Sequence, residues 1–98
     1  DKKYNGAQDF YTGSKENKRL AQCIQKSLKD TVDNSNNRSI VNSKKSIFML
    51  NGSSIPSVLI ECGFISNPDE EKNLLTPSYQ DKVADAISMG IIKYLINT

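Results

Sequence analysis

Two short, uninterrupted apolar runs constrain the fold of this chain most strongly. They are residues 46–50 (SIFML) and 57–62 (SVLIEC), and each ends at a glycine-containing turn signal. Continuous apolar runs of this length are typical of strands that are buried on both faces, as in parallel sheets covered by helices. Residues 6–11 (GAQDFY), which precede a Thr-Gly turn, predict a third strand.

Helical periodicity surrounds these strands. Residues 15–32 carry apolar side chains at every fourth position and predict an amphipathic helix of about five turns, capped by Ser14. A short helix is predicted from Pro68, with Asn67 as its cap, and a last helix of about 18 residues is predicted from the Thr-Pro pair at 76–77. Its expected apolar stripe consists of Tyr79, Val83, Ile87, Ile91 and Leu95, widened by Ala84, Ala86 and Tyr94. Gly90, inside this helix, predicts a close helix-to-sheet contact.

The order strand, helix, strand, strand, helix, helix predicts an α/β fold. We expect part of an open, mostly parallel twisted sheet flanked by helices. Three strands and two long helices would leave the edges of the sheet bare and its faces only partly covered. The chain also begins without an initiator methionine and without the apolar segment of a signal peptide. We therefore expect residues 1–98 to be part of a larger domain.

Composition excludes several kinds of chemistry. The 98 residues include no histidine, so the chain alone cannot form a Ser-His-Asp or Cys-His nucleophile, a histidine zinc site or an imidazole base. The 13 basic and 11 acidic residues nearly balance, and we expect no nucleic-acid partner. The longest apolar runs are far shorter than the roughly 20 residues of a membrane span. The two cysteines, Cys23 and Cys62, predict neither a redox motif nor a disulfide framework.

Glu61 is the leading candidate for a catalytic residue. It follows the most apolar run of the chain, so we expect its side chain to leave a strand end within an apolar neighbourhood. A buried carboxylate must be neutral, paired with a cation or bound to a metal or its water. Ligands of open α/β sheets bind at the carboxyl ends of strands, which favours a functional role. The alternative is that Glu61 points to solvent or pairs with an arginine.

Two further side chains offer weaker candidates. Arg38 stands in the polar, asparagine-rich loop 33–39, where a planar guanidinium could bind a carboxylate or a glycan of a substrate, or pair with surface acids instead. A third hypothesis is a thiol-dependent enzyme in which Cys62 is the nucleophile. Because no histidine is present to activate it, a small core residue is the favoured interpretation.

Residues 55–71 (IPSVLIECGFISNPDEE) resemble the terminal motif of the zinc-dependent N-acetylmuramoyl-L-alanine amidases. That motif is a proline, an apolar strand, a glutamate, Gly-Phe, Ser-Asn and an acidic helix start. Other segments agree in order, namely Gly-Ala-Gln at 6–8, the Asn-Asn-Arg that ends at Arg38, and a last helix that begins near Tyr79. The resemblance covers nearly the whole chain and is greatest to the spore-cortex type of sporulating Gram-positive bacteria.

The resemblance implies a peptidoglycan hydrolase that cleaves the amide between N-acetylmuramic acid and the L-alanine of the stem peptide. It implies an extracytoplasmic or cell-envelope location, including the spore cortex, and an activating protein as a further partner. In this family, two histidines and a glutamate hold a zinc ion that activates water. A second glutamate, at the position of Glu61, assists that water and stabilises the tetrahedral intermediate. The match of Arg38 implies a structural or substrate-binding role.

The family's three zinc ligands all precede the segment that matches Gly6, and nothing before Gly6 in this sequence can bind zinc. We therefore expect residues 1–98 to be the C-terminal half of the catalytic domain. This half would supply Glu61 but no metal ligand, and it would be inactive without the N-terminal half. The alternative is a non-catalytic module of the same fold that binds the cell wall or a partner protein.

Overall fold

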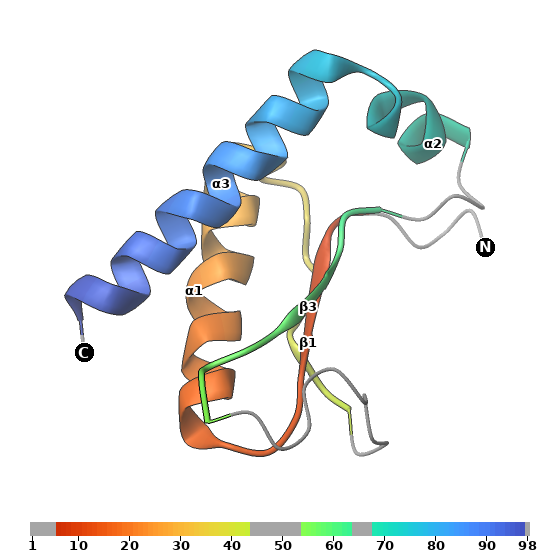
Figure 1. Ribbon diagram of the computed structural model, residues 1–98. Coiled ribbons are helices and arrows are strands. Elements are labelled where there is room, and N and C mark those ends of the chain that lie inside the picture. Colours follow the sequence, from red (N-terminus) through yellow and green to blue (C-terminus); the bar gives the residue numbers. More distant parts are fainter. Residues whose placement is uncertain (1–5, 44–53, 64–67, 98) are drawn as a thin grey trace.

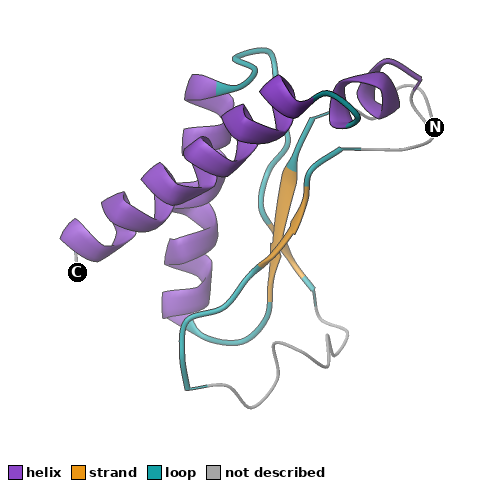
Figure 2. Ribbon diagram, turned by 45° about the horizontal axis from the view of Figure 1, so that its top comes forward, coloured by secondary structure: helices purple, strands orange, loops and turns teal. Residues whose placement is uncertain are grey.

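The computed structural model describes residues 6–43, 54–63 and 68–97. The described elements are, in order, β1 (Gln8–Tyr11), α1 (Lys15–Thr31), β2 (Val41–Asn42), β3 (Leu59–Glu61), α2 (Pro68–Leu74) and α3 (Pro77–Ile96). The strands form a sheet in the order β2-β1-β3, α1 packs against β1, and α3 crosses α1 (Figures 1 and 2). This arrangement confirms the predicted α/β class.

The sheet is mixed in direction. β1 pairs parallel with β2 and antiparallel with β3, where Gln8 lies opposite Glu61. The expectation that residues 57–62 run parallel to the first strand is therefore wrong for the described sheet. The predicted burial on both faces is also wrong for β3, because Leu59 is 41% exposed and Glu61 is exposed. The direction of a strand depends on how the connecting segments return to the sheet, and a continuous apolar run carries no information on it. The predicted strand at 46–50 lies outside the described residues.

The two predicted long helices are both present. The hydroxyl oxygen of Ser14 accepts a hydrogen bond from the backbone N–H of Asn17 at 3.1 Å, which confirms the predicted N-terminal cap of α1. The apolar face of α1 is buried, as its four-residue spacing predicts, at Leu20, Ala21, Ile24 and Leu28. α2 begins at Pro68 as predicted, while its predicted cap, Asn67, lies outside the described residues. No described helix combines the length and the apolar character needed to cross a membrane.

The buried side of α3 agrees only in part with the predicted stripe. Its buried residues are Val83, Ala86, Gly90 and Tyr94. Ile91 and Leu95, both expected in the core, are 39% and 61% exposed. The reason is that α3 crosses α1 at the small residues Ala86 and Gly90, so the buried side follows the line from Val83 to Tyr94 and leaves Ile91 and Leu95 to one side.

Gly90 is required by the contact between the two long helices. A Cβ atom at Gly90 would lie 2.7 Å from Ile24 Cα and 3.1 Å from the carbonyl oxygen of Cys23. The predicted helix-to-sheet contact is therefore wrong, because the neighbour of Gly90 is α1.

We expect Gly90→Ala to lower the free energy of unfolding. The clash should cost about 1–3 kcal/mol, because it is with backbone that cannot easily move. This loss should exceed the gain of about 1 kcal/mol in helix propensity. Urea unfolding measures the difference. Ser88→Ala, at an exposed position of α3, is the matched control and should change stability little. A more stable Gly90→Ala variant would show that the two helices can move apart without loss.

Candidate active site

The pairing of β1 with β3 decides where Glu61 lies. Directly opposed residues of an antiparallel pair project to the same face of the sheet, so Glu61 shares a face with Gln8. The neighbours of Glu61 along β3, Ile60 and Cys62, project to the other face and pack against the core formed with α1 and α3. Glu61 itself is exposed. The expected apolar neighbourhood is thus not found among the described residues, because Glu61 points away from the helices that bury its neighbours.

Arg38 is bound to the residue opposite Glu61. Its guanidinium donates a hydrogen bond from Nη2 to Oε1 of Gln8, and the Gln8 amide donates from Nε2 to the carbonyl oxygen of Ser39 at 2.8 Å. Gln8 is buried and Arg38 is half-buried. The structure therefore brings the two residues singled out in the sequence, Glu61 and Arg38, to one face of the sheet, with Gln8 as the link.

A second amide fixes the backbone of the same loop. Asn36 donates from Nδ2 to the carbonyl oxygen of Ala7 at 3.0 Å, and its Oδ1 accepts from the backbone N–H of Arg38 at 2.9 Å. Gly6 makes this approach possible, because its φ is +90° and a Cβ there would lie 2.7 Å from Asn36 Cγ. The Gly-Ala-Gln and Asn-Asn-Arg segments, far apart in the sequence, form one hydrogen-bonded unit.

Asp9 is a buried carboxyl group that the sequence analysis did not identify. Its side chain is fully buried, and neither carboxyl oxygen has a hydrogen-bond partner among the residues that the structure describes. Desolvation by burial raises the pKa of Asp9 to about 7. The alternation of residues along a strand could have indicated this burial, because Asp9 lies between Ala7 and Tyr11 on the side of β1 that faces α1.

Cys62 lies on the core side of β3. It is half-buried and packs against the hydrophobic core, as the core interpretation predicted. Burial raises the pKa of its thiol, and the nearby Asp9 carboxylate raises it further. Both effects disfavour the thiolate, which is the nucleophilic form. The structure therefore offers no support for the thiol-dependent reading.

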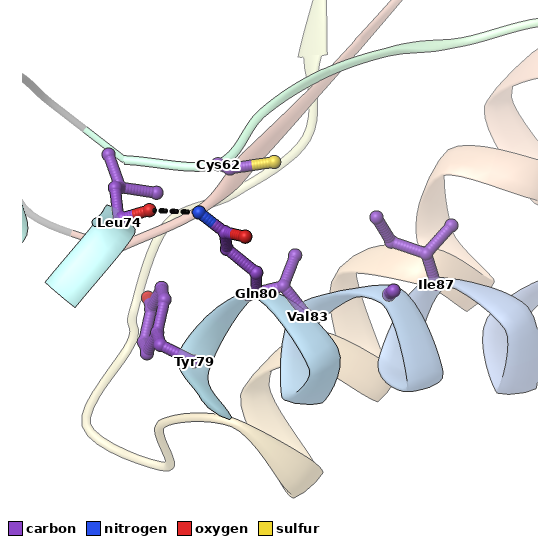
Figure 3. A pocket seen from close by; sticks show the side chains of 7 residues that line it. Cys62, Leu74, Tyr79, Gln80, Val83 and Ile87 are labelled. Carbon is purple, nitrogen blue, oxygen red and sulfur yellow. Dashed lines mark hydrogen bonds between the residues drawn. The ribbon is translucent and has the colours of Figure 1, made fainter. Parts of the chain in front are cut away.

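An apolar pocket of about 280 Å³ opens beside Cys62, between β3, α2 and α3 (Figure 3). Its lining residues are Cys62, Leu74, Tyr79, Gln80, Val83, Ala84 and Ile87. The Gln80 amide is already engaged, since its Nε2 donates to the carbonyl oxygen of Leu74 at 2.7 Å. Because Cys62 and Glu61 project to opposite faces of the sheet, this pocket is separate from the face that carries Glu61.

A zinc site requires three or four nitrogen, sulfur or oxygen ligands around one point. The described parts of the chain contain no group of three or more acidic, cysteine or histidine residues with that arrangement, and the sequence has no histidine at all. Asp9 and Cys62 are neighbours, but two side chains do not complete a site. The described residues therefore do not fit the zinc ion that the resemblance implies.

With this geometry established, comparison with known proteins defines the class. The family model described as N-acetylmuramoyl-L-alanine amidase matches residues 1–93, and the chain belongs to this family. It is 40% identical over 93 residues to the germination-specific N-acetylmuramoyl-L-alanine amidase of Bacillus subtilis, a match that covers 94% of this chain and 38% of the relative.

Two solved structures show the same fold over nearly the whole chain. The CwlD amidase from Clostridioides difficile, solved in complex with the GerS lipoprotein, has a TM-score of 0.96 at 47% identity and matches 100% of this chain and 50% of its own. An N-acetylmuramoyl-L-alanine amidase from Clostridium difficile 630 has a TM-score of 0.81 at 32% identity, covering 94% of this chain and 49% of its own. The chain thus spans about half the length of these solved relatives.

Proposed function

We propose that this chain supplies the C-terminal half of the catalytic domain of a peptidoglycan amidase. The bond cleaved joins the lactyl group of N-acetylmuramic acid to the L-alanine of the stem peptide. The observation that carries the proposal is the family match over residues 1–93, together with relatives that are about twice as long as the chain. The shared face of Glu61 and Arg38 supports it, because a carboxylate and a guanidinium are the groups that such a reaction can use.

In the proposed reaction, Glu61 acts as the general base. Its exposed carboxylate is accessible to water and to a substrate that lies against this face of the sheet. Glu61 accepts a proton from the water whose oxygen attacks the amide carbonyl carbon. As the C–N bond breaks, the same proton passes to the departing L-alanine nitrogen, so the products are the lactyl carboxylic acid and a free amine, and the acid then releases its proton to become the carboxylate. Arg38 binds the substrate beside this centre.

We further propose that the zinc ligands lie in the N-terminal half of the domain. The direction of β1 supports this arrangement. Because Gln8 lies opposite Glu61 in an antiparallel pair, β1 begins at the end of the sheet where β3 ends. Chain that leads into β1 therefore approaches the sheet beside Glu61. A parallel pair would instead have brought the end of β1 to that position.

The relatives suggest where this enzyme acts and with which partners. The name of the Bacillus subtilis relative ties it to germination, which supports peptidoglycan of the cell envelope, including the spore cortex, as the place of action. The Clostridioides difficile CwlD amidase forms a complex with the GerS lipoprotein, which supports an activating protein partner for this chain. The substrate would be the stem peptide and the glycan next to it.

Activity of the chain with and without an N-terminal half tests the proposal. We expect residues 1–98 alone to release no stem peptide from peptidoglycan and to bind no stoichiometric zinc. Joined to the N-terminal part of the Bacillus subtilis relative, the chain should release peptides with a free L-alanine amino group, detected by amine labelling and mass spectrometry. Activity or tight zinc binding by residues 1–98 alone would contradict the proposal. A folded complete domain that binds cell wall without cleaving it would favour the non-catalytic binding module.

A further inference from the structure

We propose that Gln8 is a positioning residue that holds Arg38 in place to bind a carboxylate of the stem peptide. The inference rests on the proposed function and adds a residue and a substrate group to it. It explains why a buried glutamine lies directly opposite Glu61 and why both ends of its amide are hydrogen-bonded to one loop.

Both ends of the Gln8 amide are hydrogen-bonded to neighbouring residues of that loop. Its oxygen accepts from the guanidinium of Arg38, and its nitrogen donates to the carbonyl oxygen of Ser39. Gln8 is only 6% exposed, so its amide is largely shielded from competing water. One amide therefore restrains both the side chain of Arg38 and the backbone that follows it.

The backbone of Arg38 is held independently. Its N–H donates to Asn36 Oδ1 at 2.9 Å, and Asn36 is itself anchored to the carbonyl oxygen of Ala7. With both its main chain and its guanidinium restrained, Arg38 has few rotamers left to lose when a ligand binds. Such preorganisation raises affinity because less conformational entropy is lost on association.

The charge on this face indicates which ligand group Arg38 would bind. The exposed carboxylate of Glu61 repels the carboxylates of an approaching stem peptide. A guanidinium on the same face offsets this repulsion and matches a carboxylate with two parallel hydrogen bonds. Arg38 is half-buried, so part of its side chain reaches the surface. These observations favour an anionic group of the peptide over a neutral glycan hydroxyl.

The test measures binding in a complete domain that carries Glu61→Gln, so that turnover does not interfere. The probes are a soluble muramoyl peptide with free carboxylates and the same peptide with its carboxylates amidated. We expect Arg38→Gln to weaken binding of the first probe by about 10–100-fold, the range for a hydrogen-bonded charge, and to affect the amidated probe little. Gln8→Met should weaken the first probe by about 3–10-fold and have no further effect when Arg38→Gln is already present.

Gln25→Met is the matched control. Gln25 is also buried, on α1, and its amide accepts from the backbone N–H of Asp9 at 2.8 Å and donates to the carbonyl oxygen of Ala7 at 2.9 Å. Both methionine variants lose the two hydrogen bonds of a buried amide side chain, but only Gln8→Met should discriminate between the two probes. Equal weakening of both probes by Gln8→Met, or an effect that persists without Arg38, would assign Gln8 a purely structural role and overturn the inference.

The proposed function and this inference fail in different ways. If the complete wild-type domain cleaves peptidoglycan and Glu61→Gln stops it, but neither Arg38→Gln nor Gln8→Met distinguishes the two probes, only the inference is wrong. If the wild-type domain does not cleave and neither probe binds, both are wrong.

Discussion

Glu61→Gln is expected to lower kcat of the complete domain by about 10²–10⁴-fold with little change in KM, the range for removal of a general base. Glutamine preserves the size of the side chain and its position opposite Gln8. It cannot accept the proton of the attacking water, so the chemical step slows while substrate contacts remain. Initial rates of L-alanine amine release, measured over a range of muramoyl peptide concentrations, separate the two constants.

Glu71→Gln provides the control for loss of one negative charge. Glu71 is exposed on α2, and its replacement should leave both kinetic constants close to those of the wild-type domain. A Glu61→Gln variant that keeps the full rate would show that Glu61 is not catalytic. That result would favour the cell-wall or partner-binding module.

The second large effect concerns stability and centres on Asp9. Burial raises the pKa of Asp9 from 3.8 to about 7 in the folded protein. Between about pH 4 and pH 7 the unfolded chain has therefore released a proton that the folded chain still holds. The contribution of Asp9 to the free energy of unfolding is therefore expected to be greatest below this window, to fall as the pH rises through it and to level off above about pH 7. A pKa change of this size corresponds to about 4 kcal/mol.

Asp9→Asn should abolish most of this pH dependence. The amide stays neutral, so above about pH 7 the variant should be more stable than the wild type. The gain should be smaller than 4 kcal/mol, since a buried amide without partners costs about 1–3 kcal/mol. Urea unfolding at about pH 4 and about pH 8 measures the change. Asp85→Asn, at an exposed position of α3, should retain the wild-type slope. If Asp9→Asn also retains it, another group causes the pH dependence.

Local features of this protein were predictable from its sequence. The four-residue spacing of α1 and its cap at Ser14 depend on residues within a few positions of each other, and both are confirmed. The start of α2 at Pro68 and the α/β class follow for the same reason. The family, too, was identified from residues 55–71, whose order is specific enough without any knowledge of the fold.

The incorrect predictions concern environments that were inferred from neighbouring residues in the sequence alone. Glu61 follows an apolar run, yet it is exposed, because successive strand residues face opposite sides of the sheet. Asp9, by contrast, is enclosed, although its nearest neighbours in sequence include the polar Gln8. Gly90 was correctly associated with a close contact but with the wrong partner, since nothing in its own helix reveals that α1 crosses there.

The sequence by itself determined the helices, the cap at Ser14 and the family, because periodicity, capping and motif order are properties of contiguous residues. Only the tertiary structure decided that β1 runs antiparallel to β3, that Gln8 lies opposite Glu61 and that Arg38 is bound to Gln8. These relations join residues 30 or more positions apart. They depend on strand register and on which side chains face each other across the sheet, and neither property is encoded in any one segment of the chain.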